Sequence, residues 1–186
     1  MHNNEYKTQA GISFIEVLVV LLLMSLMVSF VIPRFMSMQK GRAKKEFFSE
    51  FAKLVTDSAH QAIVTKKIHQ IFWDIDKYEI TVKIFNEKSE EQSKHKKFKI
   101  IDADVFHTNM KIPSSFKIHN FFINGNDEVK SGSTFNNAWT YIMPDGTSQP
   151  VIINIEDESE STDNKFCITI NPFYSQVSLN NAFEKP

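Results

Sequence analysis

The feature that most constrains this chain is the apolar stretch that runs from Gly11 to Pro33. Between Val17 and Ile32 its only polar residues are Ser25 and Ser29. Those residues reach about 24 Å when they form a helix, and four more residues on the N-terminal side lengthen it to about 32 Å. This is roughly the thickness of the hydrocarbon core of a bilayer, so the stretch predicts a helix that can span a membrane.

One carboxylate, Glu16, lies inside the predicted span Ile12–Ile32. A carboxylate beside lipid is unfavourable unless it reaches the interface or finds a cation. One interpretation places Glu16 at headgroup level without a further role. The other starts from a cut after Gly11, which would leave the free amine of Ile12 about one helical turn away. In a staggered stack of such helices, Glu16 of one copy can meet the amine of the next.

The residues Gly-Ile-Ser-Phe-Ile-Glu at 11–16, followed by an apolar helix, resemble the class III signal of type IV pilins and type II secretion pseudopilins. The usual family form is Gly-Phe-Thr-Leu-Ile-Glu, and Pro33 falls at the family's usual proline. The resemblance implies cleavage after Gly11 by a prepilin peptidase and N-methylation of Ile12. It also implies that Glu16 serves assembly, and that Pro33 is a structural residue of the helix.

The resemblance further implies an α+β, type IV pilin-like fold, in which a long N-terminal helix packs on antiparallel β-sheet. We expect a leader at 1–11, a transmembrane or filament-core helix at 12–33, an amphipathic half at 34–66 and a periplasmic β-rich domain at 67–186. Helical spacing supports the amphipathic half, because apolar residues recur on one face from Phe47 to Ile63. The two halves are predicted to form one helix of about 50 residues, longer than ordinary globular helices.

The rest of the chain alternates apolar and polar residues and reads as short strands. The expected strands are 71–75, 78–85, 98–101, 115–123, 139–143, 151–155, 166–170 and 174–179, with the last four forming a β-meander. The charged segments 86–97 and 156–164 are expected to be loops, and the tail 180–186 to be frayed.

A strong turn signal, Pro144-Asp145-Gly146, separates two of the C-terminal strands. Together with the Ile-Phe-Trp-Asp-Ile strand at 71–75, it resembles the H-type minor pseudopilin of type II secretion and the related FimT-like minor pilins. Those proteins carry an aromatic-x-Pro-Asp-Gly turn at the corresponding place, so these three residues are predicted to be structural.

Composition narrows the function classes. The chain has 186 residues, with 21 basic and 22 acidic side chains, so its net charge of −1 provides no electrostatic case for nucleic-acid binding. With 17 phenylalanines and only 5 glycines, it is typical of a packed domain rather than a disordered one. Cys167 is the only cysteine, which excludes an intramolecular disulfide and favours a small buried hydrophobe.

No arrangement of residues predicts an enzyme, a metal site or a cofactor. The histidines lack metal-ligand spacing, and no Gly-x-Ser-x-Gly or phosphate loop is present. Two weaker candidates for a metal site are Asp102, Asp104 and His107, and the acidic loop 156–163. A solvated turn is the better interpretation of the acidic loop, because it lacks the ordered pattern of a calcium loop.

The resemblance thus implies a minor pseudopilin, a structural subunit of a periplasmic pseudopilus that helps to drive protein export across the outer membrane. Its partners would be the prepilin peptidase, other pseudopilins in a hetero-oligomeric filament, the inner-membrane assembly platform and the bilayer around Ile12–Ile32. It would be a single-pass inner-membrane protein. One alternative is a minor type IV pilin that primes pilus assembly or DNA uptake, and only then would nucleic acid be a partner. The other is a signal-anchored periplasmic binding or enzyme domain.

Overall fold

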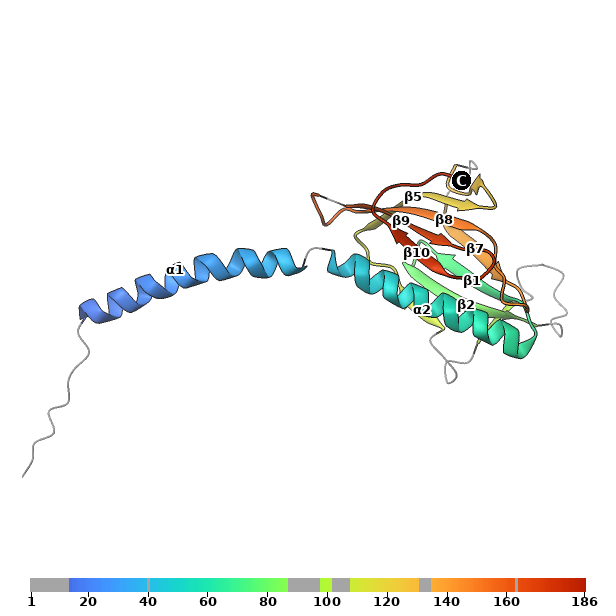
Figure 1. The fold of residues 1–186 in the computed structure, drawn as a ribbon, viewed down its shortest axis with the longest axis horizontal. Helices are drawn as coiled ribbons and strands as arrows, with labels where there is room; N and C mark the ends of the chain where they lie inside the picture. Colours follow the sequence, from blue (N-terminus) through green and yellow to red (C-terminus); the bar gives the residue numbers. More distant parts are fainter. Residues whose placement is uncertain (1–13, 40, 87–97, 102–107, 131–134, 163) are drawn as a thin grey trace, which may run out of the picture. The chain divides into compact units, whose positions relative to one another are not determined.

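The computed structural model describes residues 14–39, 41–86, 98–101, 108–130, 135–162 and 164–186, with the side chains of the first helix described as far as Ser29. The chain divides into two units, Met1–Lys40 and Gly41–Pro186. Figure 1 labels the helices and strands of both units.

The first unit contains helix α1, Phe14–Gln39. The helix continues through Pro33, as expected, and ends six residues later. Every described side chain from Phe14 to Ser29 is exposed. The hydroxyl of Ser25 donates to the carbonyl of Leu22 at 2.8 Å, so this polar group is satisfied within the helix itself.

The second unit begins with helix α2, Arg42–Thr65, and here one prediction is wrong. We expected a single helix of about 50 residues, but α1 and α2 are separate helices. The reason is Gly41, whose φ of 69° is left-handed and cannot continue a right-handed helix. The backbone N–H of Gly41 donates to the carboxylate of Glu160, which thereby places a negative charge at the start of α2.

The remaining elements form two five-stranded sheets. The first sheet has the order β3-β2-β1-β7, with β4 also paired to β2, and the second has the order β10-β9-β8-β5-β6. All pairings are antiparallel. The strands are β1 His69–Asp74, β2 Glu79–Phe85, β3 Phe98–Ile100, β4 Asn109–Lys111, β5 Phe116–Ile123, β6 Asn126–Asp127, β7 Asn137–Ile142, β8 Val151–Asp157, β9 Lys165–Ile170 and β10 Val177–Asn180. The expected α+β class with antiparallel sheets is confirmed.

The C-terminal strands do not form the single meander that we expected. Strand β7 pairs with β1, and Trp139 lies opposite Phe72. Strands β8, β9 and β10 instead extend the second sheet from β5. The alternation of apolar residues is the same for either partner, so it could not assign β7 to a sheet. The link between β7 and β8 therefore crosses from one sheet to the other.

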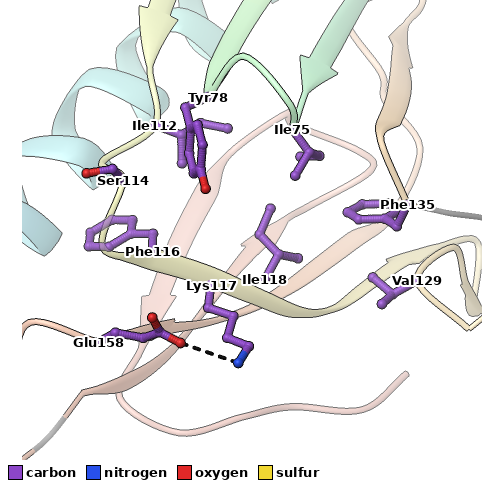
Figure 2. Close-up of a pocket in the computed structure, with 10 residues that line it drawn as sticks. All are labelled: Ile75, Tyr78, Ile112, Ser114, Phe116, Lys117, Ile118, Val129, Phe135 and Glu158. Atoms are coloured by element: carbon purple, nitrogen blue, oxygen red, sulfur yellow. Dashed lines mark ion pairs between the residues drawn. The ribbon is translucent and has the colours of Figure 1, made fainter.

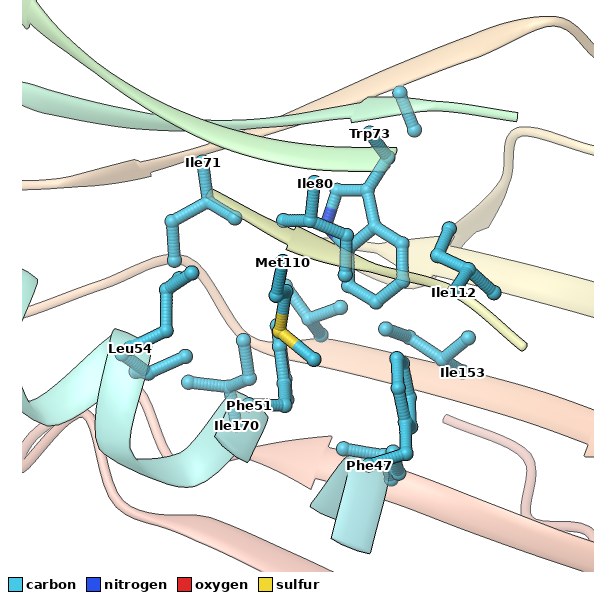
Figure 3. Packing of buried hydrophobic residues seen from close by; sticks show 14 of the residues in the cluster. Phe47, Phe51, Leu54, Ile71, Trp73, Ile80, Met110, Ile112, Ile153 and Ile170 are labelled. Carbon is cyan, nitrogen blue, oxygen red and sulfur yellow. The ribbon is translucent and has the colours of Figure 1, made fainter. Parts of the chain in front are cut away.

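The core of the second unit forms where α2 packs against both sheets (Figure 3). Phe51 of α2 is fully buried, and its ring centroid lies 5.1 Å from that of Trp73 in β1. Trp73 in turn meets Phe121 of β5 at 5.3 Å, edge to face. Burying each such side chain contributes about 1.5–3 kcal/mol, so these aromatic residues join the helix and the two sheets into one packed unit.

The expectation of a frayed tail is also wrong, because residues 181–186 are held against the second sheet by hydrogen bonds. The side-chain amide of Asn154 donates to the carbonyl of Glu184 at 2.9 Å and accepts from its N–H at 3.0 Å. Cys167 lies opposite Asn154 in the register of β8 and β9 and is fully buried. Burial, and secondarily the charge of Glu184, raise the pKa of the Cys167 thiol to about 11. The prediction of a buried, unreactive cysteine agrees with this environment.

Candidate functional site

The predicted processing and assembly residues lie at the N-terminal end of the first unit. Gly11 and Ile12 are outside the described residues, so the predicted cut and methylation remain predictions. Glu16 lies in the first turn of α1 and is exposed. A carboxylate at this end of a helix interacts favourably with the helix dipole.

Between Phe14 and Ser29, exposed apolar side chains lie on every side of α1. Phe14 is 79 % exposed, Leu22 61 % and Met27 70 %, although these three side chains point in different directions around the helix. A helix that is hydrophobic all round is stable only when apolar neighbours cover it, whether lipid or other helices. No helix in the described part of the chain is long and apolar enough to cross a membrane.

The predicted turn Pro144-Asp145-Gly146 lies in the second unit, in the link between β7 and β8. One oxygen of the Asp145 carboxylate accepts from the hydroxyl of Thr147 at 2.7 Å and from its N–H at 3.0 Å. These two hydrogen bonds, the hydroxyl's first, lower the pKa of Asp145. Gly146 has a φ of 86°, and a Cβ at this position would lie 2.8 Å from Cδ1 of Ile63 in α2. Glycine is thus favoured here by backbone conformation, and a side chain would also displace the end of the exposed Ile63 side chain.

The same turn also holds the loop between β9 and β10. The hydroxyl of Ser175 donates to the carbonyl of Gly146 at 2.7 Å, and Ser175 is buried. The N–H of Ser148 donates to the carbonyl of Pro172 at 2.8 Å. The turn therefore joins the end of α2 to the last hairpin, which accounts for a structural role of this motif.

A groove of about 430 Å³ lies between the β1–β2 hairpin and strand β5 (Figure 2). Its lining is mostly apolar and includes Ile75, Tyr78 and Phe116. At its rim the ammonium of Lys117 lies 3.3 Å from the carboxylate of Glu158, and both side chains are largely exposed. The sequence did not predict this groove, because its residues come from strands far apart in the chain.

The acidic segment 156–164 begins with the last two residues of β8, and residues 158–162 form the expected turn, in which four of the five side chains are exposed. A hydrogen bond of 2.6 Å from His119, and a weaker contribution from Asn164, lower the pKa of Glu156. Asp157 is buried and accepts from both the N–H and the hydroxyl of Ser159. Within the described residues no group of histidine, cysteine, aspartate or glutamate side chains is placed to hold a metal ion. The other candidates, at 102–107, lie outside the described residues.

The predicted site residues therefore fall into two sets. Glu16 and Pro33 belong to α1, whereas Pro144, Asp145 and Gly146 form a joint within the second unit. The structure also shows hydrogen bonds between distant residues, which the periodicity of the sequence could not predict. Glu160 accepts a hydrogen bond from Gly41, which is 119 residues away in the chain. Asn154 donates one to the carbonyl of Glu184, which is 30 residues away.

Comparison with known proteins supports the fold. No family model matches the sequence, and no curated protein matches it. Two structures of the minor pseudopilin EpsH from the type 2 secretion system of Vibrio cholerae are similar to this chain, each at 12 % sequence identity. One has a TM-score of 0.53 and covers 78 % of this chain and 98 % of its own, and the other has a TM-score of 0.50 with 73 % and 94 %. The chain thus has the fold of these two pseudopilin structures, and the expected pilin-like fold is confirmed.

Proposed function

We propose that this chain is a structural, non-enzymatic subunit, a minor pseudopilin of a type II secretion system. It joins a short periplasmic pseudopilus that helps to drive protein export across the outer membrane. The observation that carries the proposal is α1, an apolar helix whose described side chains are all exposed, in a chain that has the pseudopilin fold. Such a helix needs apolar neighbours from outside its own chain.

Two environments fit α1 in succession. Before assembly, the predicted span Ile12–Ile32 lies in the inner membrane, and the second unit is in the periplasm. After assembly, the same helix packs among the helices of other pseudopilins, with which the chain forms a hetero-oligomeric filament on an inner-membrane assembly platform. The apolar surface of α1 serves both, because lipid tails and aliphatic side chains are equally apolar.

The N-terminal end supplies the register of this assembly. The prepilin peptidase cleaves after Gly11, where the absence of a side chain leaves the backbone accessible. The new N-terminal residue, Ile12, is N-methylated and keeps its positive charge. Glu16 of one subunit then pairs with the amine of a neighbour, because a carboxylate among apolar helices is tolerable only when it is paired.

The test compares two glutamates of the same chain. Glu16→Ala is expected to leave cleavage intact but to abolish co-purification of the chain with other pseudopilins from membranes of its native host. Glu50→Ala is the matched control, since Glu50 is an exposed glutamate on α2. Wild-type co-purification of the Glu16→Ala variant would refute the role of Glu16. Co-purification with type IV pilus subunits instead would assign the chain to a pilus machine.

Processing is tested separately by Gly11→Val. The added branched side chain is expected to block the peptidase, so that the full-length precursor accumulates on a gel. A normal amount of mature-length product from this variant would contradict cleavage after Gly11.

A further inference from the structure

The outer face of the first sheet, opposite the core, carries an unusual set of side chains. Because Ile71 and Trp73 of β1 point into the core, their neighbours Gln70 and Phe72 lie on the opposite face, where Phe72 is half-buried and Gln70 is buried. The register places Phe72 opposite Trp139 of β7 and Gln70 opposite Tyr141. Aromatic and amide side chains therefore lie next to each other on this face, across two neighbouring strands.

A hollow of about 230 Å³ opens on this face, lined by Gln70, Phe72, Lys83, Asn137 and Trp139. The ammonium of Lys83 lies 3.6 Å from the ring centroid of Phe72, which holds the lysine over the aromatic face. The amide of Gln70 donates to the hydroxyl of Tyr141 at 3.4 Å. Asn137 is exposed and Trp139 half-buried, so both remain accessible from solvent.

A second hollow, of about 270 Å³, adjoins the first and shares Asn137 and Trp139 with it. Amide side chains dominate its polar lining, which includes Asn124, Asn126 and Gln149. The side-chain oxygen of Gln149 accepts from the N–H of Tyr141 at 3.0 Å, and this bond ties the loop after β7 to the strand. Trp139 and Asn137 thus stand between two concave surfaces.

The chemistry of the two hollows fits one class of ligand. Aromatic rings present flat apolar faces, and Asn and Gln amides both donate and accept hydrogen bonds. A pyranose ring has the complementary pattern, with an apolar C–H face and a rim of hydroxyl groups. Each hollow has a single charged lining residue, Lys83 in the first and Glu128 in the second, so aromatic and amide groups predominate in both and suit an uncharged ligand.

We propose that Trp139 is the centre of a binding site for a neutral saccharide of two or more pyranose units. One sugar ring stacks on the Trp139 indole beside Phe72, and the next extends into the amide-lined hollow. Asn137 hydrogen-bonds the sugar between them. This site is separate from the assembly role of α1, and the proposal does not depend on that role.

Binding can be measured on the full chain in phospholipid nanodiscs, since detergents with sugar headgroups would compete. The probes are cellotetraose and the tetramer of N-acetylglucosamine. The chain has two tryptophans, and Trp73 is fully buried, so a ligand-induced change in fluorescence reports on Trp139. We expect a saturable change with at least one probe at concentrations up to about 1 mM.

Variants then locate the site, with binding followed by saturation-transfer NMR. Trp139→Ala should abolish binding, Asn137→Ala should weaken it by about tenfold or more, and Trp139→Tyr should restore stacking and part of the affinity. Tyr174→Ala is the control, because Tyr174 is an aromatic residue 80 % exposed on a different loop. Failure of both probes to bind at about 10 mM, or binding unaltered in Trp139→Ala and Asn137→Ala, would overturn the proposal and leave cross-strand packing as the role of these aromatics.

Discussion

Helices α1 and α2 have similar lengths, 26 and 24 residues, yet they differ in where their stability comes from. On α2, six residues are buried, among them Phe51 and Leu54, and they pack on the sheets of the same chain. On α1, every described side chain is exposed, including large apolar ones such as Leu21. The contrast shows that α2 is part of the packed core of the second unit, whereas the described side chains of α1 belong to no such core.

The largest expected effect comes from making the same truncation in both helices. Leu54 is 1 % exposed, so Leu54→Ala should lower the free energy of unfolding of the second unit by about 2–5 kcal/mol through lost burial and a cavity. Leu21 is 57 % exposed, and Leu21→Ala should change the free energy of unfolding of the second unit by less than about 0.5 kcal/mol.

Denaturant unfolding of the full chain in nanodiscs, followed by tryptophan fluorescence, measures both variants. Equal losses from Leu21→Ala and Leu54→Ala would contradict the contrast, because they would mean that α1 is as much a part of this cooperative unit as α2.

The C-terminal tail sharpens the comparison, since it adds to the contacts within the second unit. Asn154→Ala removes both hydrogen bonds to the backbone of Glu184 and should cost about 1–3 kcal/mol. Loosening the tail should also expose Cys167 and speed its reaction with a maleimide, about tenfold for each 1.4 kcal/mol lost. Asn164→Ala is the matched control, because Asn164 bonds to Glu156 instead of to the tail. An unchanged labelling rate in Asn154→Ala would show that the tail does not protect the thiol.

Two glycines with left-handed backbones test the two ends of α2. Gly146→Ala is expected to cost about 1–3 kcal/mol, because the new Cβ would also meet Ile63 of α2. Gly41→Ala should cost about 1–2 kcal/mol from backbone conformation alone, since no atom lies within 4 Å of its Cβ position. Thermal unfolding compares the stability lost by the two variants. A larger loss in Gly41→Ala than in Gly146→Ala would contradict an added cost from the contact between the new Cβ and Ile63.

The smallest expected effect is a pH dependence that should appear only in the second unit. Burial lowers the pKa of His69, with the carbonyl of Lys67 opposing that shift, and the side chain is 1 % exposed. A lowered pKa in the folded state means that stability is fully present above the unfolded value near 6.5. It then falls as the pH drops towards the folded value, by at most about 1.4 kcal/mol per pH unit. His69→Gln should flatten the unfolding free energy between about pH 6.5 and 5, and an unchanged slope would argue against a buried neutral histidine.

The sequence correctly predicted features that depend on residues close together in the chain, such as a helix face and a turn. The apolar face expected from Phe47 to Ile63 is buried as far as Ala62, whereas Ile63 is 42 % exposed, and the Pro144-Asp145-Gly146 turn lies between two strands. The pairing of β7 with β1 could not be predicted, because the alternation in a strand specifies its faces but not its neighbour. The break at Gly41 was missed because a single glycine between two helical segments is also compatible with a continuous helix.

The candidate functional residues show the same difference between features that depend on nearby residues and features that depend on distant ones. A motif predicted Glu16 and its neighbours, since their spacing in sequence carries the information. Two other features join strands and loops that are distant in sequence. They are the proposed saccharide site around Trp139 and the hydrogen bonds that hold the C-terminal tail to Asn154. Such sites become visible only once the register of the sheets is known.

The most direct test of the account is the N-terminal sequence and intact mass of the protein from membranes of its native host. We predict a chain that begins at Ile12 and is about 14 Da heavier than its sequence, the increment of one N-methyl group. That result would support the processing on which assembly through α1 and Glu16 depends. A chain that still begins at Met1 would contradict it, and the signal-anchored domain would then be the better description of this protein.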